Sequence, residues 1–286
     1  MRAIVTMLIG AALLAGSDAA SKYLVERYHT GQVLCLRHAA TLLVIVPYAF
    51  TVTGVSSLRM SNWSGQLARA ALFVLTAVLM VWSLSLLPLA TVTAIIFASP
   101  LFVALLSSRM LNEPVGGRRW LAIVLGFAGV VVIVRPGAAA FELALLLPVA
   151  GALANGVRDV VTRLLSRTES SMAILFWSTL VVMLAGLATA PFGWRPVTGA
   201  DGLWFVVAGV LNAAAHFMVI EALRMGEAAL VAPFRYTILI WATALGFLVW
   251  GELPDMYVMT GALVIVASGW YMLRSERLER RARSST

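Results

Sequence analysis

The sequence has little charge and almost no cysteine. Only 12% of its 286 residues are charged and 61% are hydrophobic, far from the balance of roughly one quarter charged and one half apolar in soluble domains. The single cysteine, Cys35, excludes an internal disulfide, and the sequence has no spacing of cysteine and histidine typical of a zinc site. We therefore expect a membrane protein that uses no metal and no other cofactor.

The sequence also lacks the motifs of an enzyme or of a nucleic-acid-binding protein. Neither HExxH nor GxSxG occurs, so no protease or esterase signature is present. The net charge is +8, but the basic residues stand singly at the ends of apolar runs instead of forming a stripe. The expected partners are a small-molecule substrate and membrane lipids, with no nucleic acid; the sequence leaves the oligomeric state open.

Long apolar runs fill almost the whole chain. A helix needs about twenty mainly apolar residues to cross a bilayer, and continuous runs lack the alternation of a membrane β-barrel. The pattern predicts an all-α polytopic membrane protein with ten spans, at about 3–23, 31–53, 66–87, 89–109, 118–135, 142–165, 170–191, 202–223, 228–250 and 256–273.

Basic residues are unevenly divided between the two ends of these spans. The ends on the side of the N-terminus carry Arg2, Arg59, Arg69, Arg109, Arg118, Arg119, Arg163, Arg167, Arg224 and the tail after 273, whereas the other ends carry Lys22, Arg27, Arg135 and Arg195. Cytoplasmic loops are enriched in Lys and Arg, so both termini are expected in the cytoplasm of a bacterium, with the chain in its inner membrane. Residues 1–20 also fit a secretory signal.

The chain contains an internal repeat. "SDAASKYL" at 17–24 matches "RDVVTRLL" at 158–165. The matched positions are Asp18 with Asp159, Lys22 with Arg163, Phe97 with Tyr236, Glu113 with Glu252, and Gly129 with Gly269. The repeat divides the chain into a first unit at 1–138, a second at 139–274 and a basic tail at 275–286, and it requires the first apolar run as a permanent helix.

Five spans in each unit make the second unit upside down relative to the first. Inverted repeats are typical of secondary transporters, because the two halves exchange conformations around a central site. We therefore expect two inverted five-helix repeats around a central cavity. A channel is the rival function from another class.

Charged residues inside spans are costly and usually face a wet cavity or a partner. Arg158 and Asp159 are about 100° apart around their helix, so we expect them to point to different neighbours, with Asn155 on the face of Asp159. Arg158 is either a substrate contact or part of a structural ion pair. Asp159 and Asp18, near opposite membrane surfaces, are candidate gate, coupling or helix-pairing residues.

Two later spans carry further candidate binding residues. Asn212 and His216 share one helix face, and His216 or Asp18 could carry a proton. Arg235 suits a carboxylate, because its guanidinium binds such groups through two parallel hydrogen bonds; the alternative is a buried pair. Pro233 and Pro100 are candidate hinges.

Small residues and acidic residues give two local expectations. Ala122 and Gly126, four residues apart, favour close helix contact in the fifth span. Glu113 and Glu252 each precede a proline and suit helix starts, where a carboxylate favours the positive end of the dipole.

Several of these segments together resemble the EamA family of the drug/metabolite transporter superfamily. They are "SDAASKYL", Arg37 in "QVLCLRHAATLLVIVP", "SLLPLATVTAIIFASPLFVALLSSRMLNEP" and "ALRMGEAALVAPFRYTILIWATALGFLVWGELP". The resemblance implies ten helices in two inverted units, cytoplasmic termini and a cavity bordered mainly by spans 1, 3, 4, 6, 8 and 9. Arg37 joins the gate candidates.

The resemblance also implies a function. Similar proteins export amino acids and other metabolites, while some relatives import compounds such as S-adenosylmethionine. We expect an exporter of amino acids or related metabolites, with a metabolite importer as the alternative. On the cavity spans, the aromatic candidates for substrate contact are Trp82, Phe97, Phe217 and Tyr236.

Overall fold

The computed structural model describes residues 2–110, 117–135, 142–165, 169–225 and 232–284. Their regular structure is entirely helical. Five helices are long and apolar enough to cross a membrane, and five shorter apolar helices accompany them. These ten segments confirm the predicted all-α fold with ten apolar helical segments.

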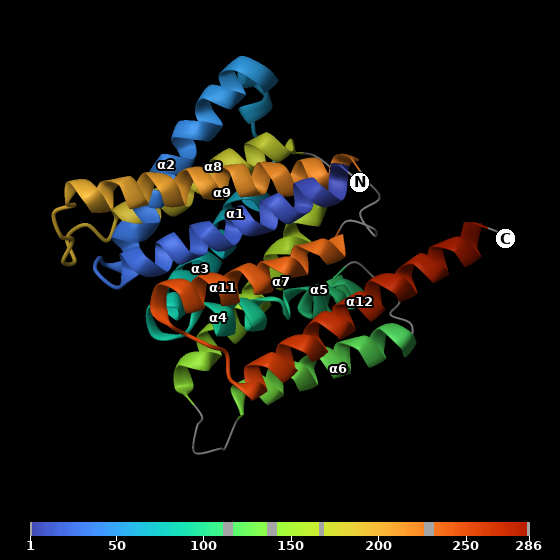
Figure 1. Ribbon diagram of the computed structural model, residues 1–286. Coiled ribbons are helices and arrows are strands. Elements are labelled where there is room, and N and C mark those ends of the chain that lie inside the picture. The colour runs from blue at the N-terminus through green and yellow to red at the C-terminus, as the bar shows by residue number, and fades with distance from the viewer. Residues whose placement is uncertain (1, 111–116, 136–141, 166–168, 226–231, 285–286) are drawn as a thin grey trace.

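The helices follow the predicted spans closely (Figure 1). The long elements are α1 Arg2–Val25, α2 Thr30–Tyr48, α3 Trp63–Leu86, α4 Leu89–Ile96, α5 Ser99–Met110, α6 Gly117–Val134, α7 Leu146–Leu165, α8 Ser171–Leu187, α9 Gly199–Met225, α11 Ile238–Trp250 and α12 Met256–Ser284. The short helical turns are η1 Ala49–Thr53, η2 Val55–Leu58, η3 Leu143–Leu145 and η4 Ala232–Thr237.

Polar side chains define where several helices begin. His29, Asn62 and Ser170 precede α2, α3 and α8, and each accepts a hydrogen bond from a backbone N–H in the first turn. Such caps satisfy donors that have no partner inside the helix. At the other end of α11, Gly251 has a φ of 68°, the left-handed conformation in which helices commonly end.

Two of the predicted spans are interrupted. The fourth span divides into α4 and α5, with a turn at Phe97 and Ala98 just before Pro100. The ninth changes from the 3-10 turn η4 to α11 after Thr237. In the predicted repeat Phe97 matches Tyr236, so both interruptions fall at equivalent positions. Pro233 lies in η4, and its side chain is outside the described ones.

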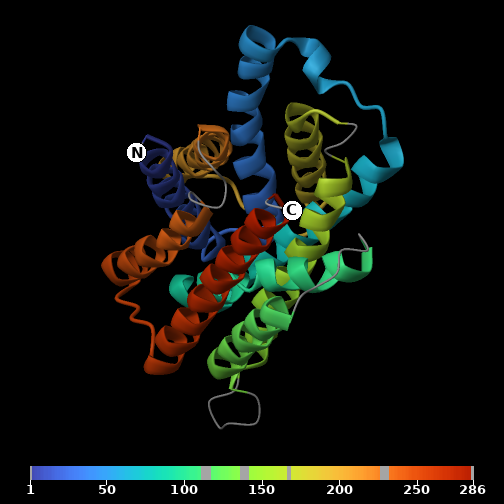
Figure 2. The same ribbon diagram turned by 90° about the vertical axis from the view of Figure 1, so that its right-hand side faces the viewer.

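The helices pack in pairs across the predicted halves (Figures 1 and 2). α1 packs on α9, so the first span contacts the eighth. In the same way α7 packs on α3, so the sixth span, which matches the first, contacts the third, which matches the eighth. The second and seventh spans pack together as α2 and α8, and the fifth and tenth as α6 and α12. This pairing pattern would stay unchanged if the two halves were exchanged; the inverted repeat itself stays a prediction.

Small residues bring α6 close to its neighbours. A Cβ at Gly129 would lie 2.8 Å from the carbonyl oxygen of Gly261, and a Cβ at Gly261 would lie 2.5 Å from that of Gly129. A Cβ at Gly126 would overlap the side chain of Leu101. Because no larger residue fits at these positions, the helices approach through small residues as in other membrane bundles. The contact expected at Gly126 is confirmed.

The first helix is an internal part of the bundle. α1 packs along α9 and α11, and Met7 and Leu24 are fully buried. The Ser17 hydroxyl donates to the carbonyl of Ala208 in α9 at 2.8 Å. This packing favours a permanent helix over a removable signal. The start of α1 and the end of α12 lie on the same side of the bundle (Figure 1).

Candidate functional site

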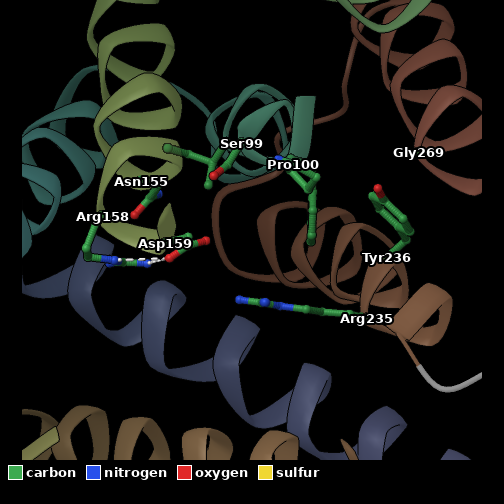
Figure 3. Close-up of a pocket in the computed structure, with 10 residues that line it drawn as sticks. Ser99, Pro100, Asn155, Arg158, Asp159, Arg235, Tyr236 and Gly269 are labelled. Atoms are coloured by element: carbon green, nitrogen blue, oxygen red, sulfur yellow. Dashed lines mark hydrogen bonds and ion pairs between the residues drawn. The ribbon is translucent and has the colours of Figure 1, made fainter. Parts of the chain in front are cut away.

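A cavity of about 200 Å³ lies where the interruptions of the fourth and ninth spans meet α7 and α12 (Figure 3). Both predicted halves contribute to its wall. The lining residues are Ile96, Phe97, Ser99, Pro100, Asn155, Arg158, Asp159, Arg235, Tyr236 and Gly269. The structure therefore brings together seven of the residues predicted from the sequence and adds Ile96, Ser99 and Gly269.

Arg235 is the cation of this cavity that has no partner. Within the described residues its guanidinium makes no hydrogen bond and no ion pair, and the residue is exposed. Figure 3 shows it extending from η4 across the cavity toward Arg158 and Asp159. A charge at membrane depth requires water or a ligand of opposite sign, and a guanidinium fits a carboxylate well. The alternative of a buried ion pair receives no support from this geometry.

The neighbouring charges on α7 bind each other. The Arg158 guanidinium donates to Oδ1 of Asp159 from NH2 at 3.1 Å and from Nε at 3.4 Å. The expectation that these two residues point to different neighbours is wrong, because the long arginine side chain folds back beside its own helix. Arg158 also donates to Thr76 at 3.3 Å and lies over the ring of Phe73.

Aromatic rings form another part of the wall. The rings of Phe97 and Tyr236 are tilted at 49° with their centroids 5.1 Å apart. These are the residues that the repeat matches with each other. A Cβ at Gly269 would overlap the Tyr236 hydroxyl, so only glycine on α12 leaves room for this ring arrangement.

Ser99 is a cavity residue that sequence reasoning missed. It begins α5, is only 8% exposed, and its hydroxyl has no hydrogen-bond partner among the described residues. A buried hydroxyl without a partner is costly. The sequence did contain a signal for Ser99, because this residue directly precedes Pro100 at a predicted helix interruption. Such interruptions expose polar groups near binding sites.

Three other predicted residues form a separate buried cluster. Arg37 donates to Asn212 and to Ser21, each at 2.8 Å, and lies 3.8 Å from Asp18. The cluster joins α1, α2 and α9. Asp18, Arg37 and Asn212 are buried and do not line the cavity.

The remaining predicted contacts also lie outside the cavity wall. His216 is half-buried on α9, within electrostatic range of Arg235. Trp82 lines another cavity, of about 360 Å³, formed by α2, α3 and α8. Phe217 is 46% exposed and packs its ring against Tyr48 at 5.5 Å.

A tightly paired cluster lies near the other end of α1. Lys22 donates to both carboxylate oxygens of Glu252, at 2.5 and 2.7 Å, and to the carbonyl of Leu87 at 3.3 Å. Near the cavity, Phe234 packs against a cluster that includes Ala3 and Met7 of α1. Met7 and Lys22 are fifteen residues apart on α1, so roughly 22 Å of helix separates the two regions.

Glu252 lies at the start of a helix, as its sequence context predicts. Its carboxylate accepts from the backbone N–H of Leu89, the first residue of α4, at 3.3 Å. The expectation that Glu252 suits a helix start is therefore confirmed, although the helix is α4 and not α12, which starts only at Met256. Lys22 and the first residue of α4 both lie within hydrogen-bonding distance of its carboxylate. Glu113 lies outside the described residues.

Comparison with known proteins agrees with this architecture. The profile of the EamA-like transporter family matches residues 1–135 and 142–274. A solved structure aligns with a TM-score of 0.67 at 19% identity, covering 94% of this chain and 96% of that chain. At this identity the likeness concerns the fold.

Curated relatives are transporters of small molecules. An S-adenosylmethionine uptake transporter of Rickettsia felis is 28% identical, over 91% of this chain and 88% of that protein. A riboflavin transporter of Vibrio cholerae is 31% identical, over 82% and 80% respectively. One of Rhizobium johnstonii is 33% identical, over 80% and 76%.

These matches agree with the ten apolar helices and with the absence of an enzyme signature in the sequence. The protein is an integral membrane transporter and not an enzyme. Since the profile covers nearly the whole chain in two successive stretches, the chain belongs to the EamA-like transporter family.

Proposed function

We propose that this protein takes up a small metabolite by alternating access, with S-adenosylmethionine as the first candidate substrate. The observation that carries the proposal is the cavity that both halves line, into which the unpaired Arg235 extends. A guanidinium there offers a binding point for an anionic group. The Rickettsia relative supports both the uptake direction and the substrate.

The proposed transport cycle uses the two ends of the bundle differently. We infer that the ion pair of Lys22 with Glu252 closes the end opposite the cavity in the described conformation. With both termini in the cytoplasm of a bacterium, as the distribution of basic residues predicts, this closed end faces outward. The cavity is then nearer the cytoplasm, where an importer releases its substrate. The proposed exchange of the two inverted units, 1–138 and 139–274, supplies the opposite conformation.

Riboflavin is the second candidate substrate. The riboflavin transporters are the more similar sequences by identity, at 31% and 33%, and the ring pair of Phe97 and Tyr236 offers an aromatic surface. The expected export of amino acids has no support among these relatives, and the importer alternative fits their names better. A cavity of about 200 Å³ is smaller than the 300–1,000 Å³ usual for drug-sized ligands, so we infer a partly closed site.

Transport into proteoliposomes tests the proposal. The purified protein is reconstituted with internal unlabelled S-adenosylmethionine, and entry of labelled compound is followed against protein-free vesicles. Counterflow is expected, and an excess of external substrate should compete with the label. Riboflavin counterflow instead would establish the second candidate. Steady ionic current without counterflow of either compound would contradict the transporter and favour a channel.

Energy coupling is tested in the same vesicles. Uptake is compared with and without a pH gradient at constant membrane potential. Stimulation by the gradient would support proton coupling through His216 or Asp18, the two groups proposed from the sequence. Equal rates would indicate facilitated diffusion, which leaves the proposed uptake function intact.

A further inference from the structure

Two opposite charges face each other across the cavity without touching. Arg235 projects from η4, and Asp159 projects from α7 (Figure 3). No ion pair joins them. Oδ1 of Asp159 accepts from Arg158, whereas Oδ2 makes no hydrogen bond within the described residues, and the side chain is 48% exposed. The cavity therefore presents one free cationic group and one free carboxylate oxygen.

Arg158 is not available as a second carboxylate ligand. Its guanidinium binds Asp159 and Thr76 and covers the ring of Phe73, and its side chain is only 20% exposed. These contacts fix Asp159 in place with its second oxygen directed away from the pair. Of the two roles that the sequence left open for Arg158, the geometry supports the structural ion pair.

The unpaired hydroxyl of Ser99 adds a third polar group to the same wall. It is buried, has no hydrogen-bond partner among the described residues and lies on the lining of this cavity. A hydroxyl both donates and accepts, so it matches a ligand amine or a ligand carboxylate. Its position independently offers a hydrogen-bond partner to a polar group of a ligand in the cavity.

We propose that the cavity selects substrates that carry an α-amino-acid group. The carboxylate binds Arg235, the ammonium binds Oδ2 of Asp159, and the Ser99 hydroxyl forms an additional hydrogen bond. The rest of the substrate lies against the rings of Phe97 and Tyr236. This inference rests on the proposed uptake function, and it separates S-adenosylmethionine, which has such a group, from riboflavin, which has none.

The physical basis is the cost of leaving the two charges without a bonded counterpart. In a site with low dielectric constant, opposite charges interact strongly, but in the described conformation no ion pair joins Arg235 to Asp159. A ligand with its own carboxylate and ammonium on one carbon satisfies both walls at once. A ligand with only one of these charges leaves the other wall without its counterpart.

The test combines substrate analogues with variants of each wall. Binding is measured with S-adenosylmethionine, its decarboxylated analogue and its deaminated analogue, on the full protein and on Arg235→Gln, Asp159→Asn and Ser99→Ala. Each analogue should bind the unmodified protein at least about tenfold more weakly, since charge-assisted hydrogen bonds of about 1.5–3 kcal/mol are lost and 1.4 kcal/mol is tenfold. Ser99→Ala should weaken S-adenosylmethionine binding about two- to tenfold.

The decisive result is whether each variant becomes insensitive to the loss of one particular charged group of the substrate. In Arg235→Gln the loss of the substrate carboxylate should no longer matter, and in Asp159→Asn the loss of the ammonium should no longer matter. Glu142→Gln is the matched control, because it removes an exposed carboxylate outside the cavity lining. Asp159→Glu, which keeps the charge, covers the case that Asp159→Asn fails to fold.

Equal binding of all three compounds would overturn the inference, even where S-adenosylmethionine uptake persists. Failure of the proposed function is a different result, namely no counterflow of S-adenosylmethionine or riboflavin by the unmodified protein. In that case, binding of methionine against its decarboxylated and deaminated analogues decides the inference separately. Binding that requires both charged groups would support it, and absence of such binding would overturn it.

Discussion

Two groups of charged side chains, about one helix length apart, differ in how completely they are paired. Lys22 is buried, with 5% of its side chain exposed, and it binds Glu252 and the carbonyl of Leu87. Arg235 is exposed to a cavity and has no partner within the described residues. The first arrangement holds helices together, whereas the second leaves binding capacity for a ligand.

The energetic consequences of the two arrangements are opposite. Removing one partner of a buried ion pair strands the other charge in a medium of low dielectric constant, which is strongly destabilising. Removing a cation that makes no ion pair and no hydrogen bond leaves no buried, bonded partner without its counterpart. Paired charges are therefore expected to govern stability, and unpaired charges to govern substrate binding.

The largest loss of stability is expected for Lys22→Met. The substitution leaves the Glu252 carboxylate without its cation, and because 26% of that side chain is exposed, water reduces the cost to about 2–3 kcal/mol from the 3–5 kcal/mol of a fully buried pair. Thermal unfolding in detergent measures the change. The double variant with Glu252→Gln should lose less than the sum of the single variants; strict additivity would mean that the pair does not couple.

Arg235→Gln should have the opposite profile. Uptake is expected to fall about ten- to a hundredfold, since the substrate loses a charge-assisted interaction, while the unfolding temperature stays the same or rises. Initial uptake rates and thermal unfolding are measured on one preparation. A large drop in the unfolding temperature would show that Arg235 has a structural partner and would remove the contrast with Lys22.

A smaller effect is expected from the pH dependence of stability at Glu169. Its Oε1 accepts from the Ser61 hydroxyl at 2.7 Å and from the backbone N–H groups of Ser61 and Asn62. These bonds, the Ser61 hydroxyl first, hold the pKa of Glu169 below its usual value of 4.5. The stabilisation is therefore complete above about pH 4.5 and is lost as the pH falls through the lowered pKa. Unfolding temperatures between pH 3 and 7 should fall less steeply for Glu169→Gln than for the unmodified protein.

The smallest effect is expected for Trp82→Ala. The ring lies on the separate cavity between α2, α3 and α8, so uptake should stay within about twofold of the unmodified protein, as for a contact that does not reach the substrate. Tyr236→Ala, which removes part of the wall, is the comparison variant. Loss of uptake in Trp82→Ala would show that Trp82 contacts the substrate, as the sequence predicted.

The fold was largely predictable because hydrophobic length is a local property. Each apolar run of about twenty residues carries the information for one span, and the described helices follow these runs. The interruptions near Phe97 and Thr237 were also signalled, by Pro100 and Pro233. The helix ends were less predictable: α12 continues to Ser284, well past the expected end of the span at 273.

The site was only partly predictable, because partners distant in sequence decide which charges remain free. The sequence indicated Arg235, Arg158 and Asp159 from the cost of charge in a membrane. It gave no reason to pair Arg158 with its neighbour, and it treated Asn212 as a cavity residue, although Asn212 instead accepts a hydrogen bond from Arg37. Composition limits how many charges the bundle contains, but not which of them meet.

The sequence by itself determined a helical membrane protein, because long apolar runs are stable in a bilayer only when each helix satisfies its own backbone hydrogen bonds. Only the tertiary structure decided that Lys22 meets Glu252 across 230 residues, while Arg235 and Asp159 stay apart on facing walls. Such pairings depend on how the helices cross in space. Two opposite charges form an ion pair when their side chains can reach each other, and they stay free to bind a ligand when they cannot.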